Sequence, residues 1–548
     1  MNSGENKHNS SGVLYRLSVF LVIICFFSCS SVVQRKNIFR YNEATGIGTL
    51  DPAFAKNQSV MWAIHQVYNT LVEVDDSLHI VPSVAERWEI SPDNLTFTFH
   101  LRNNVFFHDD PCFVNGKGRK LIAPDIVFSF ARILNKSTAS SGAWIFNDRL
   151  DSMKPFTALD DSTFQLKLLR PFNPIAGILS MQYCSVIPHE AVEKYGNDFR
   201  RHPVGTGPFQ FVAWEEGQAL IFKKNKNYFE FDSAGNRLPY LNGVKINFYD
   251  SKATEFLEFR QNRLDFINDI DPSFKDEILT KNGSLRSEWQ GKIRLLKQPF
   301  LNTEYLGFLS DTTNVLLKDS PVRSKEFRQA VNYAIDKKKL ILYMRNSLGT
   351  PAESGFVPMG LPAFNGKELQ GYIYNPLKAL ELLNQIGYNA ASPQIKLITV
   401  PVYADIGSFI VNQLRQVGIK VQLEVIQKSL LLEQTSKSQA LFFRGSWIAD
   451  YPDAENYLSV FYSKNPAPPN YTRYKNVEFD NKYEQALAEK NELKRNELYR
   501  EADRIMMKDA PVVPLWYDMV IRLYHNNVKN FKTNSLNMLE LRRVKLSD

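Results

Sequence analysis

Short apolar runs rich in β-branched and aromatic residues alternate with stretches of helical periodicity from residue 36 onward. One helical stretch is ATEFLEFRQ at 253–261. The runs expected to form strands are NIFRYN (37–42), LTFTFHLR (95–102), TFQLKLL (163–169), VKINFYD (244–250), IKLITV (395–400) and KVQLEVI (420–426). Because strands and helices alternate along the chain, the pattern predicts α/β lobes.

The clearest single helix is expected over residues 375–386. Asn375 is placed to cap its start, Pro376 suits its first turn, and Gly387 ends it. The apolar residues that recur at helical spacing along it are Leu377, Leu380, Leu383 and Ile386. We expect this stripe to face the core, and the strands that follow the helix to form a βαβ unit.

The chain has 548 residues, which is too long for one hydrophobic core, because cores stop growing at roughly 250 to 300 residues. We therefore expect at least two lobes. The sequence contains no internal repeat and no long Gly/Ser linker, so crossing strands rather than a flexible tether are predicted to join the lobes.

Composition narrows the class of protein. Hydrophobic residues make up 44% and charged residues 23% of the chain, as in an ordinary globular protein. The 66 basic and 58 acidic residues are interspersed along the whole length. Because a nucleic-acid-binding protein needs a basic stripe or a recognisable module, we expect no nucleic-acid partner.

The N-terminus has the pattern of a targeting segment. Lys7 and Arg16 precede LSVFLVIICFF, an apolar run of 11 residues. A bilayer span needs about 20 apolar residues, so this run fits the core of a signal peptide. Ser28 and Cys29 follow it and resemble the lipobox of bacterial lipoproteins. The resemblance implies that residues 1–28 are removed and that Cys29 is acylated, which would anchor the protein to a membrane; an ordinary secretory signal is the alternative.

The sequence contains no complete catalytic or metal-binding motif. HEAVE at 189–193 lacks the second histidine of a zinc helix, and GTG at 205–207 runs into proline where a phosphate loop would continue. The 8 histidines are scattered singly, and no nucleophile motif is present. We therefore expect no enzymatic activity, no metal and no cofactor. Cys112 and Cys184 would remain after signal removal, either as one disulfide or as two free thiols.

Seven segments, taken in order, resemble the family-5 extracellular solute-binding proteins of ABC importers, which bind dipeptides and oligopeptides. They are GTLDPAF (48–54), IVPSVAERWEISPDNLTFTFHLRNNVFFHDD (80–110), APDIVFSFARIL (123–134), PVGTGPFQF (203–211), FRQAVNYAIDKKKLI (327–341), RGSWIADYPD (444–453) and DAPVVPLWY (509–517). The resemblance covers nearly the whole mature chain.

The resemblance implies a two-lobed periplasmic-binding-protein-like α/β fold of the class II type, with an extra subdomain and a hinge between the lobes. On that template the parts are as follows: lobe I from 30–78, 203–300 and 512–548, the extra subdomain from 79–202, and lobe II from 301–511. The hinge crossings are expected within YLGFLSD (305–311) and PLWYDMV (514–520).

The resemblance also implies a ligand site at RGSWIADYPD. Asp450 matches the aspartate that holds the ligand's α-ammonium, and Arg444 matches a position that receives the carboxylate in some oligopeptide binders. Trp447 and the backbone at Gly445 would form a wall along an extended peptide. Asp453 is expected to shape the turn. The alternatives are a turn role for Asp450, a core position for Trp447 and a surface ion pair for Arg444.

Further contacts are expected from Asn57 and Tyr305. Lys56 stands where some oligopeptide binders place an acid beside the ligand's amino end, so a lysine facing the cleft would disfavour an ammonium there. The resemblance implies that the protein captures peptides and delivers them to an ABC permease with its ATPase subunits, as a monomer. The alternative is a non-peptide solute such as an oligosaccharide, nickel chelate, opine or haem.

Overall fold

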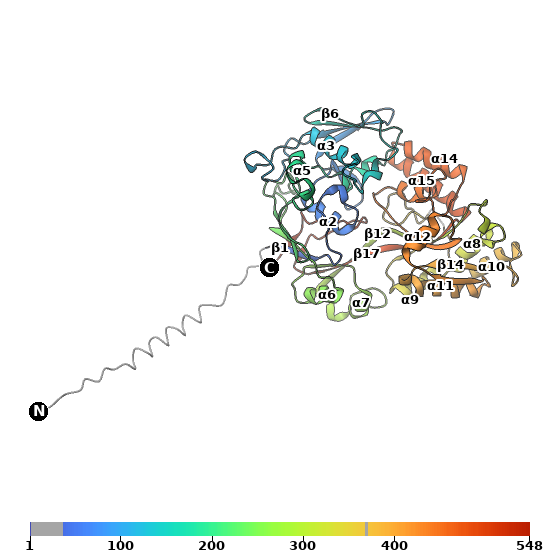
Figure 1. Ribbon diagram of the computed structural model, residues 1–548. Helices are drawn as coiled ribbons and strands as arrows, with labels where there is room; N and C mark the ends of the chain where they lie inside the picture. Colours follow the sequence, from blue (N-terminus) through green and yellow to red (C-terminus); the bar gives the residue numbers. More distant parts are fainter. Residues whose placement is uncertain (2–36, 368–370, 548) are drawn as a thin grey trace.

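The computed structural model describes Met1 and residues 37–367 and 371–547. Figure 1 shows two α/β lobes side by side, with the long strands β12 and β17 between them. This is the two-lobed fold that the sequence predicts. Five of the six predicted runs correspond to strands whose ends lie within two residues of the predicted ones, whereas the strand predicted over 244–250 ends already at Asn247. The predicted signal peptide and Cys29 lie outside the described residues.

Lobe I is built on a four-stranded sheet in the order β1-β10-β9-β8, in which β1 and β10 are parallel and the other pairs antiparallel. Its strands are β1 (Ile38–Asn42), β10 (Gly243–Asn247), β9 (Ala219–Lys224) and β8 (Phe209–Glu215). Its helices are α2 (Gln58–Val67), α6 (Lys252–Arg260) and α7 (Pro272–Ile278), and its first turn is η1 (Pro52–Phe54).

The extra subdomain carries an antiparallel sheet in the order β4-β5-β7-β6. Its strands are β4 (Ala85–Ile90), β5 (Thr96–Leu101), β7 (Thr163–Lys167) and β6 (Phe156–Asp160), and its helices are α3 (Ala123–Leu134), α4 (Ile175–Ile178) and α5 (His189–Tyr195). The hairpin of β2 (Val72–Val74) and β3 (Ile80–Pro82) connects it to lobe I. The buried residues of the subdomain and of lobe I form one continuous hydrophobic cluster. This shared core favours movement of the two parts as one body.

A seven-stranded sheet runs from lobe I into lobe II in the order β11-β17-β12-β16-β14-β15, with β11 at the lobe I end and β13 (Thr350–Pro351) paired to β17. The strands are β11 (Phe266–Asn268), β17 (Val512–His525), β12 (Ile293–Phe308), β16 (Phe442–Ile448), β14 (Ile395–Thr399) and β15 (Val421–Val425). The helices of lobe II are α8 (Lys325–Ala334), α9 (Lys337–Arg345), α10 (Pro376–Gln385), α11 (Ala404–Gln416), α12 (Lys428–Ser436), α13 (Glu455–Leu458), α14 (Val477–Ala488) and α15 (Glu492–Asp509). Strands β14 and β15 are parallel with α11 between them, which confirms the predicted βαβ unit.

The ends of helix α10 agree with the prediction, but its buried face does not. Asn375 caps it by accepting a hydrogen bond from the Lys378 amide, and Gly387 follows with a φ of +67°. Leu377 and Leu380 are 77% and 40% exposed, so the predicted apolar stripe was wrong. The residues that the helix buries are Ala379, Leu382 and Leu383. Periodicity located the helix, whereas the contact with its neighbours selected the buried face.

Strands β12 and β17 are paired along both lobes, and their pairing is irregular at two neighbouring places in the middle. Residues Ile293–Pro299 of β12 pair regularly with Met519–His525 of β17. The pairing resumes at Thr303, which lies opposite Tyr517. The first part lies beside β11 and the second beside β16. The first irregular stretch of β12 is therefore 300–302, and the second is the register shift between Glu304 and Tyr305, where the segment 305–311 expected from the resemblance begins.

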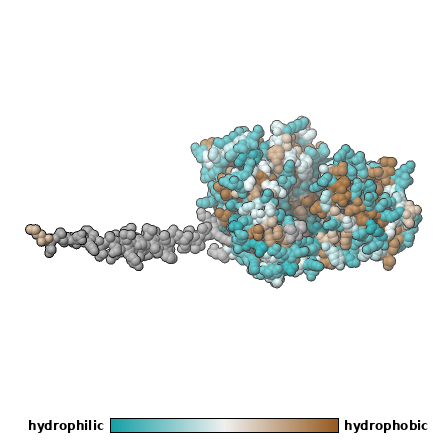
Figure 2. Space-filling model, turned by 60° about the horizontal axis from the view of Figure 1, so that its bottom comes forward, coloured by the Kyte–Doolittle hydropathy of each residue, from teal (hydrophilic) through white to brown (hydrophobic). Residues whose placement is uncertain are grey.

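Among the described residues, no helix is both long and apolar enough to cross a bilayer. Figure 2 shows hydrophilic residues over most of one face, with hydrophobic patches more frequent on the side of lobe II. Cys112 and Cys184 are free thiols, which settles the alternative left open by the sequence.

The glycines of the PVGTGPF segment allow it to lie against the end of helix α2. A Cβ atom added at Gly205 would stand 2.1 Å from the carbonyl oxygen of Val67, and one added at Gly207 would stand 2.4 Å from its carbonyl carbon. Since no real Cβ approaches backbone so closely, the segment requires glycine at both positions. The GTG sequence therefore has a packing role.

We predict that Gly205→Ala lowers the free energy of unfolding by about 1 to 3 kcal/mol, because the added methyl group must displace backbone. Urea or thermal unfolding measures the change. Gly48→Ala is the matched control, since a Cβ there meets nothing within 4 Å, and it should shift stability by less than about 0.5 kcal/mol. Equal stability of the two variants would contradict this packing.

Candidate functional site

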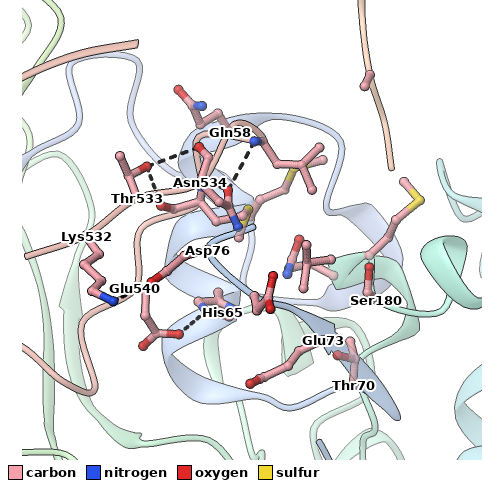
Figure 3. A pocket seen from close by; sticks show the side chains of 18 of the residues that line it. Gln58, His65, Thr70, Glu73, Asp76, Ser180, Lys532, Thr533, Asn534 and Glu540 are labelled. Atoms are coloured by element: carbon pink, nitrogen blue, oxygen red, sulfur yellow. Dashed lines mark hydrogen bonds and ion pairs between the residues drawn. The ribbon is translucent and has the colours of Figure 1, made fainter. Parts of the chain in front are cut away.

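A cavity of about 930 Å³ lies between the two lobes. Its wall comes from helix α2, the β2–β3 hairpin, the turn before Cys184, the loop after β16 and the C-terminal segment 530–543. Figure 3 shows polar side chains from several of these elements converging on it. The lining residues with charged side chains are Lys56, His65, Glu73, Asp75, Asp76, Asp450, Lys532, Glu540, Arg542 and Arg543.

Helix α2 lines one side of the cavity with Gln58, Met61 and His65, and the residues just before the helix line it as well. Asn57 caps the helix, accepting a hydrogen bond from the Val60 amide at 3.1 Å. Met61 and His65 follow at a spacing of four residues, which places them on one helix face. Lys56 directly precedes the cap. Lys56 and Asn57, both expected from the sequence to contact the ligand, line the cavity.

A buried charge network lies beneath the lobe I wall. The Arg542 guanidinium pairs with Glu73 at 2.6 Å, Glu230 at 2.6 Å and Glu540 at 3.2 Å. Glu540 Oε2 also lies 3.2 Å from His65 Nε2, within hydrogen-bonding distance, and Figure 3 marks this contact. Although burial tends to raise the pKa of Glu540, Arg542 and His65 lower it to about 2. The three carboxylates of this network therefore already share Arg542 as a partner within the protein.

Lobe II contributes Asp450, which is held by its neighbours on both sides. The Ala449 amide donates to the Leu301 carbonyl at 2.9 Å, and Ala449 packs in a lobe II core. Tyr451 is 2% exposed and packs instead in the core of lobe I and the subdomain. The Asp450 side chain remains accessible and lines the cavity. Asp450 thus stands where a lobe II loop reaches across to the other lobe.

The environment of Asp450 favours its neutral form more than water would. Burial among the surrounding protein raises its pKa to about 6; a hydrogen bond from Asn456 opposes the rise, and the charge of Glu455 adds to it. Among the described residues, no cation is paired with this carboxylate. A ligand cation that approaches Asp450 would meet a carboxylate without a cationic partner. Its charge would also favour the ionised form of that carboxylate.

Trp447 orients Asp450 indirectly. Its indole Nε1 donates to Asn456 Oδ1 at 3.0 Å, and the Asn456 amide is the group that bonds Asp450. Trp447 is half-buried beside a lobe II core and is not part of the cavity wall. The structure therefore places it behind the candidate ligand contact.

Arg444 is occupied by an internal partner. Its Nη2 donates to Glu304 Oε1 at 2.7 Å, and its guanidinium carbon lies 3.8 Å from the centre of the Tyr403 ring. Glu304 is 2% exposed, so this is a buried pair rather than the surface pair considered from the sequence. Burial raises the pKa of Glu304, and the Arg444 charge opposes that rise. Arg444 lies outside the cavity wall.

Gly445 and Tyr305 pack against each other, away from the cavity wall. They are opposite in the β12–β16 pairing, and a Cβ at Gly445 would lie 2.5 Å from Tyr305 Cζ. Tyr305 is 4% exposed and meets Phe356 edge to face. Asp453 accepts a hydrogen bond from the Glu455 amide at 2.9 Å, in keeping with a turn role.

Several lining residues escaped the sequence analysis. The apolar ones include three methionines: Met61, Met181 and Met538. The spacing of Met61 and His65 along α2 is a signal that could have identified them. The C-terminal segment 530–543 offers no such signal, because it is irregular and enters the wall only through tertiary packing. Among the residues that the structure describes, no cluster of three or more metal-binding side chains is present.

Comparison with known proteins agrees with this architecture. Residues 79–469 match the family described as bacterial extracellular solute-binding proteins, family 5. Heme-binding protein A of Haemophilus influenzae is 28% identical over 494 residues, covering 85% of this chain and 84% of that protein. The dipeptide-binding protein of Escherichia coli is 25% identical over 548 residues, covering 96% and 97%.

The fold is also similar to that of a solved structure. It is the ABC transporter-associated periplasmic binding protein DppA from Helicobacter pylori in complex with the peptide STSA. It is 26% identical with a TM-score of 0.72, covering 93% of this chain and 98% of that one. The match of the family model over most of the chain shows that this protein belongs to family 5 of the bacterial extracellular solute-binding proteins.

Proposed function

We propose that this protein binds short peptides through their free amino end in the interlobe cavity and delivers them to an ABC permease. The observation that carries the proposal is Asp450, a carboxylate without a cationic partner among the described residues, at the wall of a cavity of about 930 Å³. Binding without catalysis is the whole activity proposed.

A peptide ammonium suits this carboxylate physically. An ammonium that leaves water needs a charged partner and further acceptors, or its desolvation cost is not recovered. Asp450 supplies the charge, and Asn456 and Trp447 fix the side chain in place. The peptide ligands named for the Escherichia coli and Helicobacter pylori relatives support this choice.

The apolar part of the wall suits varied side chains. Met61, Met181 and Met538 line the same cavity as Asp450. Thioether side chains are flexible and polarizable, so they adapt to groups of different shape. This part of the cavity would accept ligand side chains without strong selection among them.

Closure of the lobes over the ligand is the second part of the proposal. The irregular stretch 300–302 of β12 supports it, because interrupted pairing is the place where two crossing strands bend most readily. Lobe II also contacts the subdomain through the turn after α14, where Asn94 and Asn173 donate to the carbonyls of Ala488 and Glu489. These contacts change when the lobes move apart.

Attachment to a membrane through Cys29 is the third part. It rests on the short apolar run that ends at Ser28 and Cys29. A lipid-anchored protein would remain near its permease at the outer side of the membrane, where the family acts.

Haem is the second candidate ligand. Three thioethers and His65 line one cavity, and methionine and histidine are both axial ligands of haem iron. The Haemophilus influenzae relative carries the name of a haem-binding protein. An unpaired acid on the wall favours the peptide, because haem offers no cation to Asp450.

We predict that Asp450→Ala weakens peptide binding by about 2 to 5 kcal/mol, roughly 30-fold to several-thousand-fold, because the ligand ammonium loses the carboxylate that faces it once the lobes close. Calorimetric titration with cognate peptide and with its N-acetylated form measures the effect. Acetylation should weaken binding to the wild type and make little difference to the variant.

Asp453→Ala is the matched control, since that carboxyl bonds the Glu455 amide and does not line the cavity. It should lower stability modestly and leave affinity near that of the wild type. Unchanged affinity in Asp450→Ala, or no effect of acetylation, would exclude the ammonium contact and favour a non-peptide ligand such as haem.

For closure, we predict that saturating peptide reduces the radius of gyration measured by small-angle X-ray scattering, because the lobes approach each other around the ligand. N-acetylated peptide at the same concentration serves as the control and should produce less change. Superimposable curves with and without bound peptide would argue against closure.

For the anchor, we predict that Cys29→Ala moves the protein from the membrane fraction to the soluble fraction, because the acylated thiol is lost. Cys25→Ala is the control, since that residue would leave with the signal peptide, and its product should stay on the membrane. Membrane attachment of Cys29→Ala equal to that of the wild type would refute the lipoprotein assignment.

A further inference from the structure

Each charged side chain around the cavity contacts a partner within the protein that carries, or can carry, the opposite charge, with two exceptions. Glu73 and Glu540 pair with Arg542, and Lys532 pairs with Asp76 at 2.8 Å. Arg543 lies 3.8 Å from Glu230. Asp75 accepts the amides of Ser77 and His79 and contacts the His79 ring at 3.4 Å. Within residues 37–367 and 371–547, Lys56 and Asp450 are the lining residues that lack such partners.

Lys56 and Asp450 face the cavity from different lobes. Lys56 lies between η1 and α2 in lobe I, and Asp450 lies in the loop after β16 in lobe II. The two carry opposite charges. A ligand between them would meet a cation on one side and an anion on the other.

The backbone under Lys56 is firmly anchored. Asp51 accepts the Ala53 amide at 3.0 Å and both Nη atoms of Arg132 at 2.6 and 2.8 Å. The Lys56 amide donates to the Phe54 carbonyl at 2.8 Å, and α2 starts two residues later. The position of this lysine is therefore fixed by the fold, although its side chain is exposed. The positive end of the α2 dipole adds to its attraction for an anion.

The arginines near the crossing strands cannot take a ligand carboxylate without losing a partner. Arg444 is held by Glu304, and Arg345 pairs with Asp518 at 2.7 Å. Neither lines the cavity. Among the described lysines and arginines that line the cavity, Lys56 is the one without a carboxylate partner within the protein.

We propose that the ligand is a short zwitterion whose carboxylate is bound by Lys56 of lobe I while its ammonium is bound by Asp450 of lobe II. This inference rests on the proposed function, since it keeps Asp450 as the partner of the ammonium. It assigns the carboxyl end to a residue that the sequence suggested only as a source of repulsion.

The arrangement makes the ligand an electrostatic bridge between the lobes. Closure removes water from the cavity, so each unpaired charge there must find a partner or oppose closure. A ligand with both charges compensates Lys56 and Asp450 at once, whereas a ligand with one charge leaves the other uncompensated. Lys56 therefore selects ligands with a free carboxyl end.

The test compares free and amidated carboxyl ends. A mixed library of di- and tripeptides with neutral side chains is prepared in both forms and incubated with the wild-type protein, Lys56→Gln and Lys532→Gln. Bound peptides are separated by size exclusion and quantified by mass spectrometry. Lys532→Gln is the matched control, because that lysine lines the same cavity but is already paired with Asp76.

We expect the wild type and Lys532→Gln to retain the free acids over the amides by at least about tenfold, and Lys56→Gln to retain both forms equally. A preference for free acids that survives in Lys56→Gln, or its absence in the wild type, overturns the role of Lys56. Asp450→Ala separates the two proposals, because it should lose both forms. Retention of no peptide in any form by the wild type would overturn the proposed function, and this inference with it.

Discussion

The backbone of Leu301 joins the two walls of the cleft at the point where the lobes cross. Its amide donates to the Ser535 carbonyl at 2.9 Å, and its carbonyl accepts the Ala449 amide at 2.9 Å. Ser535 belongs to the C-terminal segment of the lobe I wall, and Ala449 precedes Asp450. These bonds replace the β12–β17 pairing that is interrupted at this residue. The position of the candidate ligand contact thus depends on a break in the central strand pair.

The charges around the cleft divide into those that build it and those left for a ligand. Arg542 with its three carboxylates and Arg444 with Glu304 form ion pairs within the protein. Breaking such a pair is costly, because the remaining charge stays buried without a partner. Exposed charges without partners cost little in the open cleft and gain a partner only when a ligand enters. This difference explains why Asp450 and Lys56, rather than the more deeply buried arginines, are the candidates for recognition.

The structure places four of the residues expected around RGSWIADYPD in contacts that the sequence did not indicate, while Asp450 lines the cavity. Trp447 orients Asn456, and through it Asp450, instead of forming a wall. Gly445 makes room for the ring of Tyr305, which packs in a core. Arg444 has a buried partner that lies 140 positions away in the sequence. Each role depends on a residue from another strand, so the local sequence could not reveal it.

The sequence by itself determined the elements whose signals are local. Alternating runs located strands such as β5 and β14, and capping residues located both ends of α10, because these features depend on neighbours along the chain. A resemblance carried by short segments also singled out Asp450 and Lys56, both of which line the cavity. The tertiary structure alone decided which face of α10 is buried and which charges are already paired. It also brought the C-terminal segment to the cavity wall, since packing and ion pairing join residues hundreds of positions apart and leave no periodic trace in the sequence.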